Sequence, residues 1–253
     1  MLLQVPKREE DMINGKKLAA LLAKLSLEER EKIIYKEIIK GNIPNALRKF
    51  TKIRVVGKDA NGIHHKLIIW VLSDYLSIGS DKNFLRIPMT PHTAQSIANH
   101  FDCLLPTKKT VDEIWKSGKV KLQPQPIDVN VYNITSPKVF YLHQQLIEMQ
   151  RKGKLLGMLT VGHKKDIVIT NRLINHPDRV AIYGWHYLDG KPIQPLSIIH
   201  SSRYYDYSHG IRLIRNIVQI DGYHMKLEKM LRNKNLSYLL SDEGPISFLR
   251  YPT

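Results

Sequence analysis

The stretch KIRVVGKDANGIHHKLIIWVL, residues 52–72, has the pattern of two β-strands joined by a turn. KIRVV and HKLIIWVL are rich in branched residues, which favour extended backbone, and DANG between them contains residues that turns select. A third run of this kind, FLRIP at 84–88, follows a GSD turn at 79–81. Because such segments pair with their neighbours, we expect an antiparallel meander over about 51–88.

Helices are expected on both sides of this meander. Ser26 and Glu29 have the spacing of a capping box, in which two side chains satisfy free backbone donors at a helix start. Isoleucines then recur on one face up to Gly41, and a proline follows the start signal of two later helices. The further helices are predicted from Thr90, over 108–117, and from Ser136 to Gly153.

The second half of the chain returns to strands. LLGMLTV, DIVIT, RVAIYGW, PIQPLSII and GIRLIRNIV lie between 155 and about 220, and a last helix is expected over 223–232. Strands and helices therefore occur in blocks, which favours an α+β fold with a mostly antiparallel sheet. We expect one domain over 1–253, with a helical N-terminal region at 1–50 and a candidate linker at 119–135.

Composition limits the classes of protein. The chain has a hydrophobic fraction of 43% and a formal net charge of +16, from 39 basic and 23 acidic residues. It can bury a core, no apolar run is long enough for a transmembrane segment, and the charge favours an anionic polymer as partner, either cell wall or nucleic acid. A cytoplasmic location is expected if Met1 is the native start, and an exported one if a signal has been removed.

Proton-transfer groups gather at the ends of strands in the second half. GHKKD at 162–166, GWHY at 184–187 and DYSHG at 206–210 each place imidazole or carboxyl groups beside a turn. Consecutive hairpins can bring such ends together, and a rigid sheet then holds them. We expect one cleft formed by His163, Asp166, His186, Asp206 and His209; the alternative is that these side chains cap strands or face solvent.

Cys103 is the preferred nucleophile if catalysis is covalent. Its thiol could attack a carbonyl if His163 or His209 lowered the thiol pKa and an aspartate oriented the imidazole. The alternative is a buried cysteine with a packing role only. Ser208 and His209 are neighbours, and neighbouring residues of a strand point to opposite faces, so direct proton transfer between these two is not expected.

SHGIRL at 208–213 resembles the catalytic segment of L,D-transpeptidases, whose motif runs Ser, His, Gly, Cys and then an arginine. Ser208, His209, Gly210 and Arg212 match, whereas Ile211 stands where the family has its nucleophilic cysteine. The resemblance covers about six residues and implies a related role directed at the cell wall. The missing thiol argues against the transpeptidase reaction itself.

A zinc site is the third chemical alternative. His163, Asp166 and His186 supply the His, Asp, His set of zinc carboxypeptidases that act on peptidoglycan, and GWHY is similar to their tryptophan and histidine segment. Only two residues separate His163 from Asp166, fewer than in that family, and both are lysines. The sequence therefore leaves the cofactor open.

These patterns together predict a hydrolase-like protein that acts on an anionic polymer, with cell-wall peptide amide bonds as candidate substrates. Cysteine- and zinc-dependent amide hydrolysis both remain open as mechanisms. The alternative is a nucleic-acid-binding module without catalysis, in which basic side chains contact phosphates and some of the twelve tyrosines and three tryptophans stack on bases.

Overall fold

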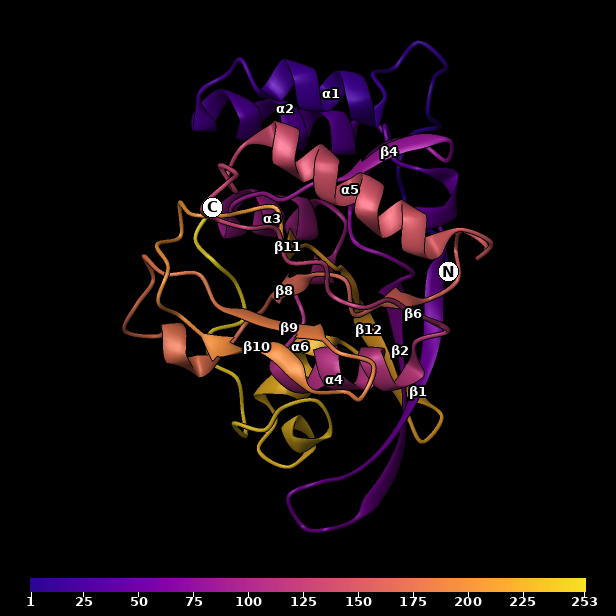
Figure 1. The fold of residues 1–253 in the computed structure, drawn as a ribbon. Helices are drawn as coiled ribbons and strands as arrows, with labels where there is room; N and C mark the ends of the chain where they lie inside the picture. The colour runs from indigo at the N-terminus through magenta and orange to yellow at the C-terminus, as the bar shows by residue number, and fades with distance from the viewer.

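The computed structural model describes all residues 1–253 and confirms the α+β class. Figure 1 shows α1, α2 and α5 at one end of the molecule, α4 and α6 in its lower part, and a long hairpin that projects beyond them. The six α-helices are α1 Gly15–Leu22, α2 Leu27–Ile39, α3 Pro91–His100, α4 Lys108–Ser117, α5 Pro137–Arg151 and α6 Leu227–Arg232. Three 3₁₀ helices are η1 Asn45–Leu47, η2 Asn171–Leu173 and η3 Leu236–Leu239.

The largest sheet has five strands and is antiparallel throughout. Its strands are β1 Phe50–Lys58, β2 His64–Leu72, β12 Ile214–Ile220, β13 Tyr223–Met225 and β5 Cys103–Leu104. The predicted hairpin is confirmed, because β1 and β2 pair in register from Phe50 opposite Leu72 to Lys58 opposite His64. β12 then pairs with β2, so the first and second halves of the sequence share this sheet.

A second sheet of four strands has the order β10–β9–β8–β11. These strands are β8 Lys165–Ile167, β9 Ile182–His186, β10 Pro192–Ser197 and β11 His209–Gly210. β8 and β9 are antiparallel, whereas β11 runs parallel to β8 and places His209 opposite Lys165. This parallel pair brings the DYSHG segment beside the GHKKD segment.

Two small sheets complete the strands. β3 Ser77–Ser80 and β4 Asn83–Arg86 form an antiparallel hairpin, and β6 Val120–Lys121 pairs in parallel with β7 Thr160–Val161. The expected meander therefore divides, because β3 and β4 leave the large sheet after β2. The stretch 119–135, expected as a candidate linker, contains β6 and the buried Ile127, whose N–H donates to the hydroxyl of Tyr207.

Helix start signals are confirmed at several positions. Ser26 and Glu29 form the capping box of α2, and the hydroxyls of Thr90 and Thr107 accept from backbone N–H groups at the starts of α3 and α4. The last helix was predicted too early, since it begins at Leu227. Tyr223–Met225 forms β13 instead, because Asp221 and Gly222 adopt positive φ and turn the chain back onto β12.

The main hydrophobic core is a cluster of 57 buried residues that draws on the two larger sheets and on all six α-helices. It includes Leu18, Ile34, Ile69, Ile97 and Ile182, all with almost no exposed surface. None of the helices is both long and apolar enough to cross a lipid bilayer.

Candidate active site

A group of buried polar side chains lies where β8, β9 and β11 approach the end of β2. We call this group the buried polar centre. Each member has less than a tenth of its surface exposed, although most such residues are normally found at the surface. The members are Asp74, Tyr75, Arg86, His143, His163, Lys164, Asp166, Trp185, Asp206, Tyr207, Ser208, His209 and Arg212.

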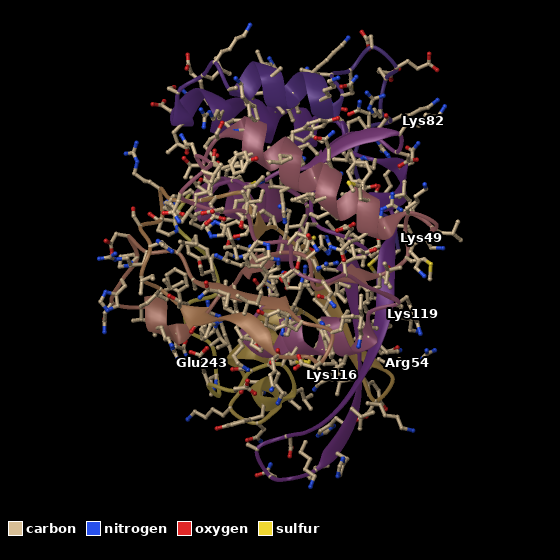
Figure 2. All side chains as sticks on the ribbon, viewed as in Figure 1. Lys49, Arg54, Lys82, Lys116, Lys119 and Glu243 are labelled. Atoms are coloured by element: carbon tan, nitrogen blue, oxygen red, sulfur yellow. The ribbon has the colours of Figure 1, made fainter.

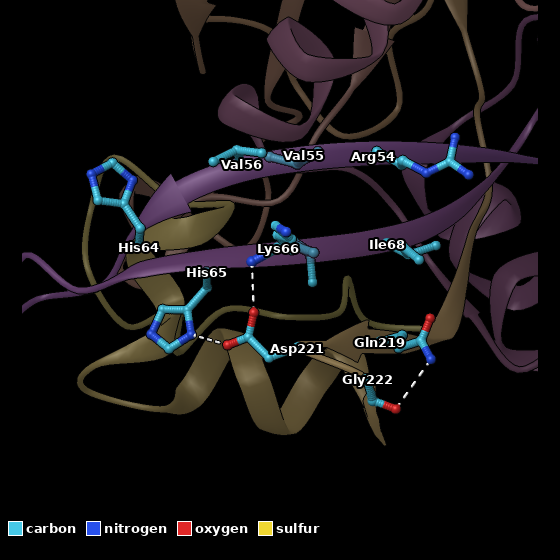
Figure 3. A pocket seen from close by; sticks show the side chains of 11 residues that line it. Arg54, Val55, Val56, His64, His65, Lys66, Ile68, Gln219, Asp221 and Gly222 are labelled. Carbon is cyan, nitrogen blue, oxygen red and sulfur yellow. Dashed lines mark hydrogen bonds and ion pairs between the residues drawn. The ribbon is translucent and has the colours of Figure 1, made fainter.

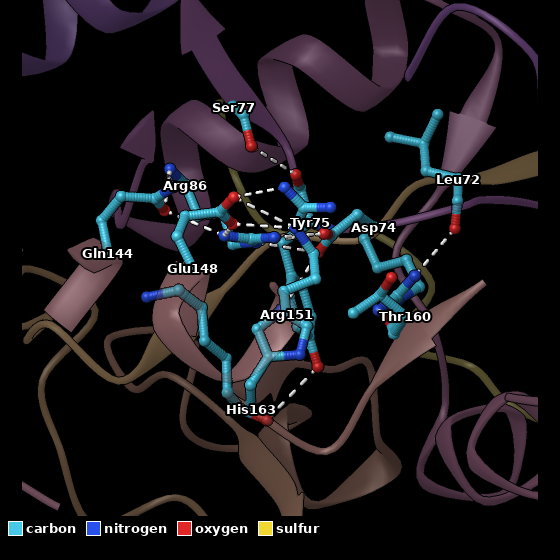
Figure 4. Close-up of polar contacts among 12 residues, drawn as sticks. Leu72, Asp74, Tyr75, Ser77, Arg86, Gln144, Glu148, Arg151, Thr160 and His163 are labelled. Carbon is cyan, nitrogen blue, oxygen red and sulfur yellow. Dashed lines mark hydrogen bonds and ion pairs between the residues drawn. The ribbon is translucent and has the colours of Figure 1, made fainter. Parts of the chain in front are cut away.

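One side of the centre is a charged network around Asp74 (Figure 4). The guanidinium of Arg86 donates to both carboxylate oxygens of Asp74, with a shortest distance of 2.6 Å, and Nε2 of His163 lies 3.0 Å from Asp74 Oδ1. Arg86 also contacts Glu148 at 2.8 Å. Burial opposes ionisation of Asp74, but the positive charge of Arg86 offsets it and holds the Asp74 pKa well below its usual value.

A second contact set joins Asp166 to Tyr75. The Tyr75 hydroxyl donates to Oδ2 of Asp166 at 2.8 Å, and the Tyr75 ring meets the His163 ring edge-on at 5.0 Å. The guanidinium of Arg212 lies over the Tyr75 ring, 4.3 Å from its centroid, and donates to the backbone carbonyls of Leu72 and Thr160. Burial raises the pKa of Asp166 to about 6, against the positive charge of Arg212.

The DYSHG segment forms the other side of the centre. Oδ1 of Asp206 accepts from the hydroxyl of Ser208 at 2.5 Å and from its backbone N–H at 2.7 Å. Both ring nitrogens of the fully buried His209 lack a hydrogen-bond partner. Burial lowers the pKa of His209, so its imidazole is neutral at pH 7. Ser208 is therefore held by Asp206, not by His209, as the strand geometry predicts.

Lys164 lies between these two sides. Its amine donates to the carbonyl of Tyr207 and makes no ion pair with any carboxylate. Burial, with the positive charge of Arg86 added, lowers the pKa of Lys164 to about 7. A lysine in such surroundings can exchange a proton at neutral pH, which an exposed lysine cannot do.

Trp185, a member of the buried polar centre, has a strained backbone conformation. Its φ is 57°, a region that bulky residues rarely adopt and that costs about 1–3 kcal/mol. Its backbone N–H donates to the carbonyl of Lys164 at 3.1 Å, and its indole ring meets the rings of His143 and Tyr207 edge-on. Strained residues of this kind cluster at functional sites.

The structure brings four of the expected site residues into the buried polar centre. His163 and Asp166 both contact Tyr75, and Asp206 and His209 lie on the segment that pairs with β8. His186 takes a different direction: its Nε2 lies 3.4 Å from Asp112 on α4, and its ring packs beside Trp115. The expected cleft of five residues is thus a buried cluster that lacks His186.

The zinc alternative is wrong. His163 points at Asp74, Asp166 at Tyr75 and His186 at Asp112, so the three proposed ligands do not converge. No three His, Cys, Asp or Glu side chains anywhere in the structure are placed so that they could hold a metal ion together.

Cys103 as nucleophile also requires correction. The thiol is fully buried on β5 and donates to the carbonyl of Phe101, and no histidine contacts it. Burial raises its pKa to about 12, so the reactive thiolate is almost absent at neutral pH. Cys103 has the environment of a core residue, which is the alternative that the sequence left open.

Several members of the buried polar centre were not predicted as site residues from the sequence. Asp74 lies two residues after the end of β2, Arg86 is the last residue of β4, and His143 comes from the buried face of α5. Charged residues inside otherwise apolar segments were the available signal at Asp74 and Arg86. Lys164 was noted only as one of the two lysines between His163 and Asp166, since its burial depends on contacts distant in the sequence.

A cleft at the surface leads toward the Ser208 side of the centre. It has a volume of about 270 Å³ and is lined by Leu27, Arg30, Thr135, Arg203, Tyr204 and Tyr205. The Tyr204 hydroxyl donates to Asp206 Oδ2 at 3.0 Å, and its ring meets the His209 ring at 5.8 Å. Tyr204 therefore separates this cleft from Ser208.

No model of a known protein family, no curated protein and no solved structure matches this chain.

Proposed function

We propose that this protein is a hydrolase of amide or ester bonds in which Lys164 is the general base and Ser208 is the nucleophile. The observation that carries the proposal is the buried Lys164 amine, which has no carboxylate partner and a pKa of about 7. A general base is most effective when its pKa lies near the working pH. Asp206, Ser208 and the histidines of the buried polar centre, His143, His163 and His209, then form its surroundings.

The reaction proceeds in two balanced steps. Ser208 Oγ attacks the substrate carbonyl carbon while its proton passes to Nζ of Lys164, and collapse of the tetrahedral species breaks the bond to the leaving amine or alcohol, which takes that proton. Water then attacks the acyl-enzyme, Lys164 again accepts the proton, and Ser208 Oγ recovers it as the acid is released. In the resting structure the Ser208 hydroxyl donates to Asp206 Oδ1 at 2.5 Å, so it has to leave this bond and turn toward Lys164 before its proton can pass to Nζ.

Ser208 is favoured as nucleophile over the other hydroxyls by its position. It directly follows Tyr207, whose carbonyl accepts from the Lys164 amine, and its own carbonyl accepts from the N–H of Lys165. In the segment similar to L,D-transpeptidases, Ile211 replaces the cysteine and is fully buried in the core, so this proposal assigns the attack to a hydroxyl.

The surface cleft supports an anionic substrate. Arg203 is exposed at its rim, and Tyr204 separates the cleft from Asp206 and Ser208. An acyl group that carries a carboxylate would meet Arg203 before it reaches the centre past Tyr204. Peptide bonds of cell-wall polymers, which carry free carboxylates, are the candidate natural class.

The test uses purified peptidoglycan, p-nitrophenyl esters of short dicarboxylic acids, and a fluorophosphonate that labels activated serines. We expect hydrolysis whose rate rises through about pH 7, and labelling of Ser208 seen by peptide mass spectrometry. Lys164→Met and Ser208→Ala should each lose about 10²–10⁴-fold in rate. Cys103→Ser is the matched control and should keep full activity.

Two results would refute the mechanism. One is hydrolysis that survives unchanged in Lys164→Met. The other is the absence of both hydrolysis and fluorophosphonate labelling in the folded wild-type protein.

A further inference from the structure

The outer face of the large sheet carries exposed and partly exposed side chains. Side chains alternate along β1, so Ile53 and Val55 point into the core while Lys52 and Arg54 point outward. On β2 the outward positions are Lys66, Ile68 and Trp70, and on β12 and β13 they include Ile217, Gln219 and His224. We call this surface the outer sheet face.

A groove crosses the outer sheet face (Figure 3). Its volume is about 860 Å³, and Val56 and Ile68 provide apolar lining. Arg54 on β1 and Lys66 on β2 place their cationic groups along the same groove. A surface of this kind offers both apolar contact and positive charge to one ligand.

The cations of the groove are free to meet an anion. None of the ion pairs of the protein involves Lys52, Arg54 or Lys66. The acid at the rim, Asp221, is already engaged by the His65 ring at 2.6 Å and by the backbone N–H of Lys66 at 2.8 Å. This carboxylate is therefore already hydrogen-bonded within the protein.

The positive charge continues beyond the groove. Figure 2 shows Lys49, Lys119 and Arg54 along one edge of the molecule, with their amines and guanidinium directed outward. All three side chains are exposed. The edge extends the basic surface from the groove toward the first residue of β1.

Flat rings accompany these cations. Trp70 on β2 and His224 on β13 stack with centroids 6.1 Å apart and an interplanar angle of 19°. Trp70 is half-exposed and His224 is exposed, so ring surface remains accessible to a ligand. Aromatic side chains on an open sheet beside basic ones form the kind of surface on which unpaired bases stack.

We propose that the outer sheet face binds single-stranded nucleic acid. Successive outward cations of β1 are roughly 7 Å apart, because each residue advances a strand by about 3.3 Å, and phosphates of an extended strand repeat on a comparable length. Unpaired bases can reach Trp70 and His224, whereas the bases of a duplex are buried in their stack. Among anionic polymers, single-stranded nucleic acid combines repeated charge with flat rings.

The test measures fluorescence anisotropy of a labelled oligothymidylate as salt is varied. We expect Arg54→Glu with Lys66→Glu to weaken binding about tenfold or more and to lower the salt slope by about 1.4, since each contact to a single strand contributes about 0.7. The matched control is Lys17→Glu with Lys24→Glu, an equal charge change on exposed lysines near α1. That control should keep most of the wild-type affinity.

The stacking part is tested by comparing Trp70→Leu with Trp70→Phe. The leucine variant should bind about fivefold or more weakly, and phenylalanine should restore most of the affinity. Lys164→Met should bind as the wild type does, because this surface does not depend on the proposed hydrolase. The hydrolase proposal and the binding proposal can therefore fail independently, because hydrolysis and oligonucleotide binding are measured separately.

Three outcomes would overturn the proposal. They are equal weakening by the control pair, tighter binding of a duplex of the same length, and equal competition by polyphosphate at the same charge concentration. The last outcome would show general attraction of polyanions without recognition of bases.

Discussion

Replacing Lys164 by methionine is expected to make the protein more stable. In the folded protein burial lowers the Lys164 pKa from an ordinary 10.5 to about 7. Each unit between the two values corresponds to about 1.4 kcal/mol, so the buried amine costs the folded state up to about 5 kcal/mol. Methionine removes this cost and loses one hydrogen bond to Tyr207, worth about 1 kcal/mol.

The sign of the pH dependence follows from the same two values. The unfolded chain binds more protons than the folded protein between about pH 7 and pH 10.5, so the contribution of Lys164 to stability becomes more favourable as the pH rises through this range. Lys164→Met should therefore exceed the wild type by up to about 4 kcal/mol at pH 6. The difference should shrink by about 3 kcal/mol at pH 9.

Urea unfolding of both proteins at pH 6 and pH 9 measures this difference. Lys119→Met, the same chemical change at an exposed position, is the control and should alter the free energy of unfolding by less than about 0.5 kcal/mol. The conclusion that burial lowers the Lys164 pKa and destabilises the folded protein would be refuted by either of two results. One is a variant less stable than the wild type at pH 6, and the other is a stability difference between variant and wild type that is equal at the two pH values.

Two further perturbations probe other buried groups. Asp74→Asn removes one of the two carboxylates that pair with Arg86 and leaves only Glu148, so it should cost about 3 kcal/mol of unfolding free energy at pH 7. Because the pKa of Asp74 is held low, this loss should diminish only as the pH falls below about 4. Urea unfolding at pH 7 and pH 3 measures it, and an equal loss at both pH values would contradict the prediction. Cys103, with its pKa raised to about 12, should resist alkylation by iodoacetamide at pH 8 until the protein unfolds; mass spectrometry that finds rapid native labelling would contradict its buried position.

Local signals made much of the fold predictable from the sequence. The turn residues between β1 and β2 and the capping box at Ser26 depend on neighbours in the chain, and both are confirmed. The start of α6 was not predictable in this way, because the pairing of β13 with β12 takes Tyr223–Met225 out of the helix. Tertiary pairing there overrides local preference.

In the candidate site, too, some residues were predictable from the sequence and others depend on tertiary contacts. His163, Asp166, Asp206 and His209 stood out because polar residues at strand ends are visible in one sequence. Their actual partners, Asp74 and Arg86, come from distant segments, and no periodicity indicates which carboxylate a buried arginine will meet. The burial that sets the pKa of Lys164 is likewise a property of the assembled fold alone.

The parallel pairing of β11 with β8 has a consequence for biosynthesis. His209 pairs with Lys165, and the same region must also meet Tyr75 and the end of β2, far earlier in the chain. A ribosome that has released only the first two hundred residues therefore carries a chain in which Lys164 still lies in water with an ordinary affinity for protons. Its unusual chemistry begins only when the DYSHG segment emerges and closes over it.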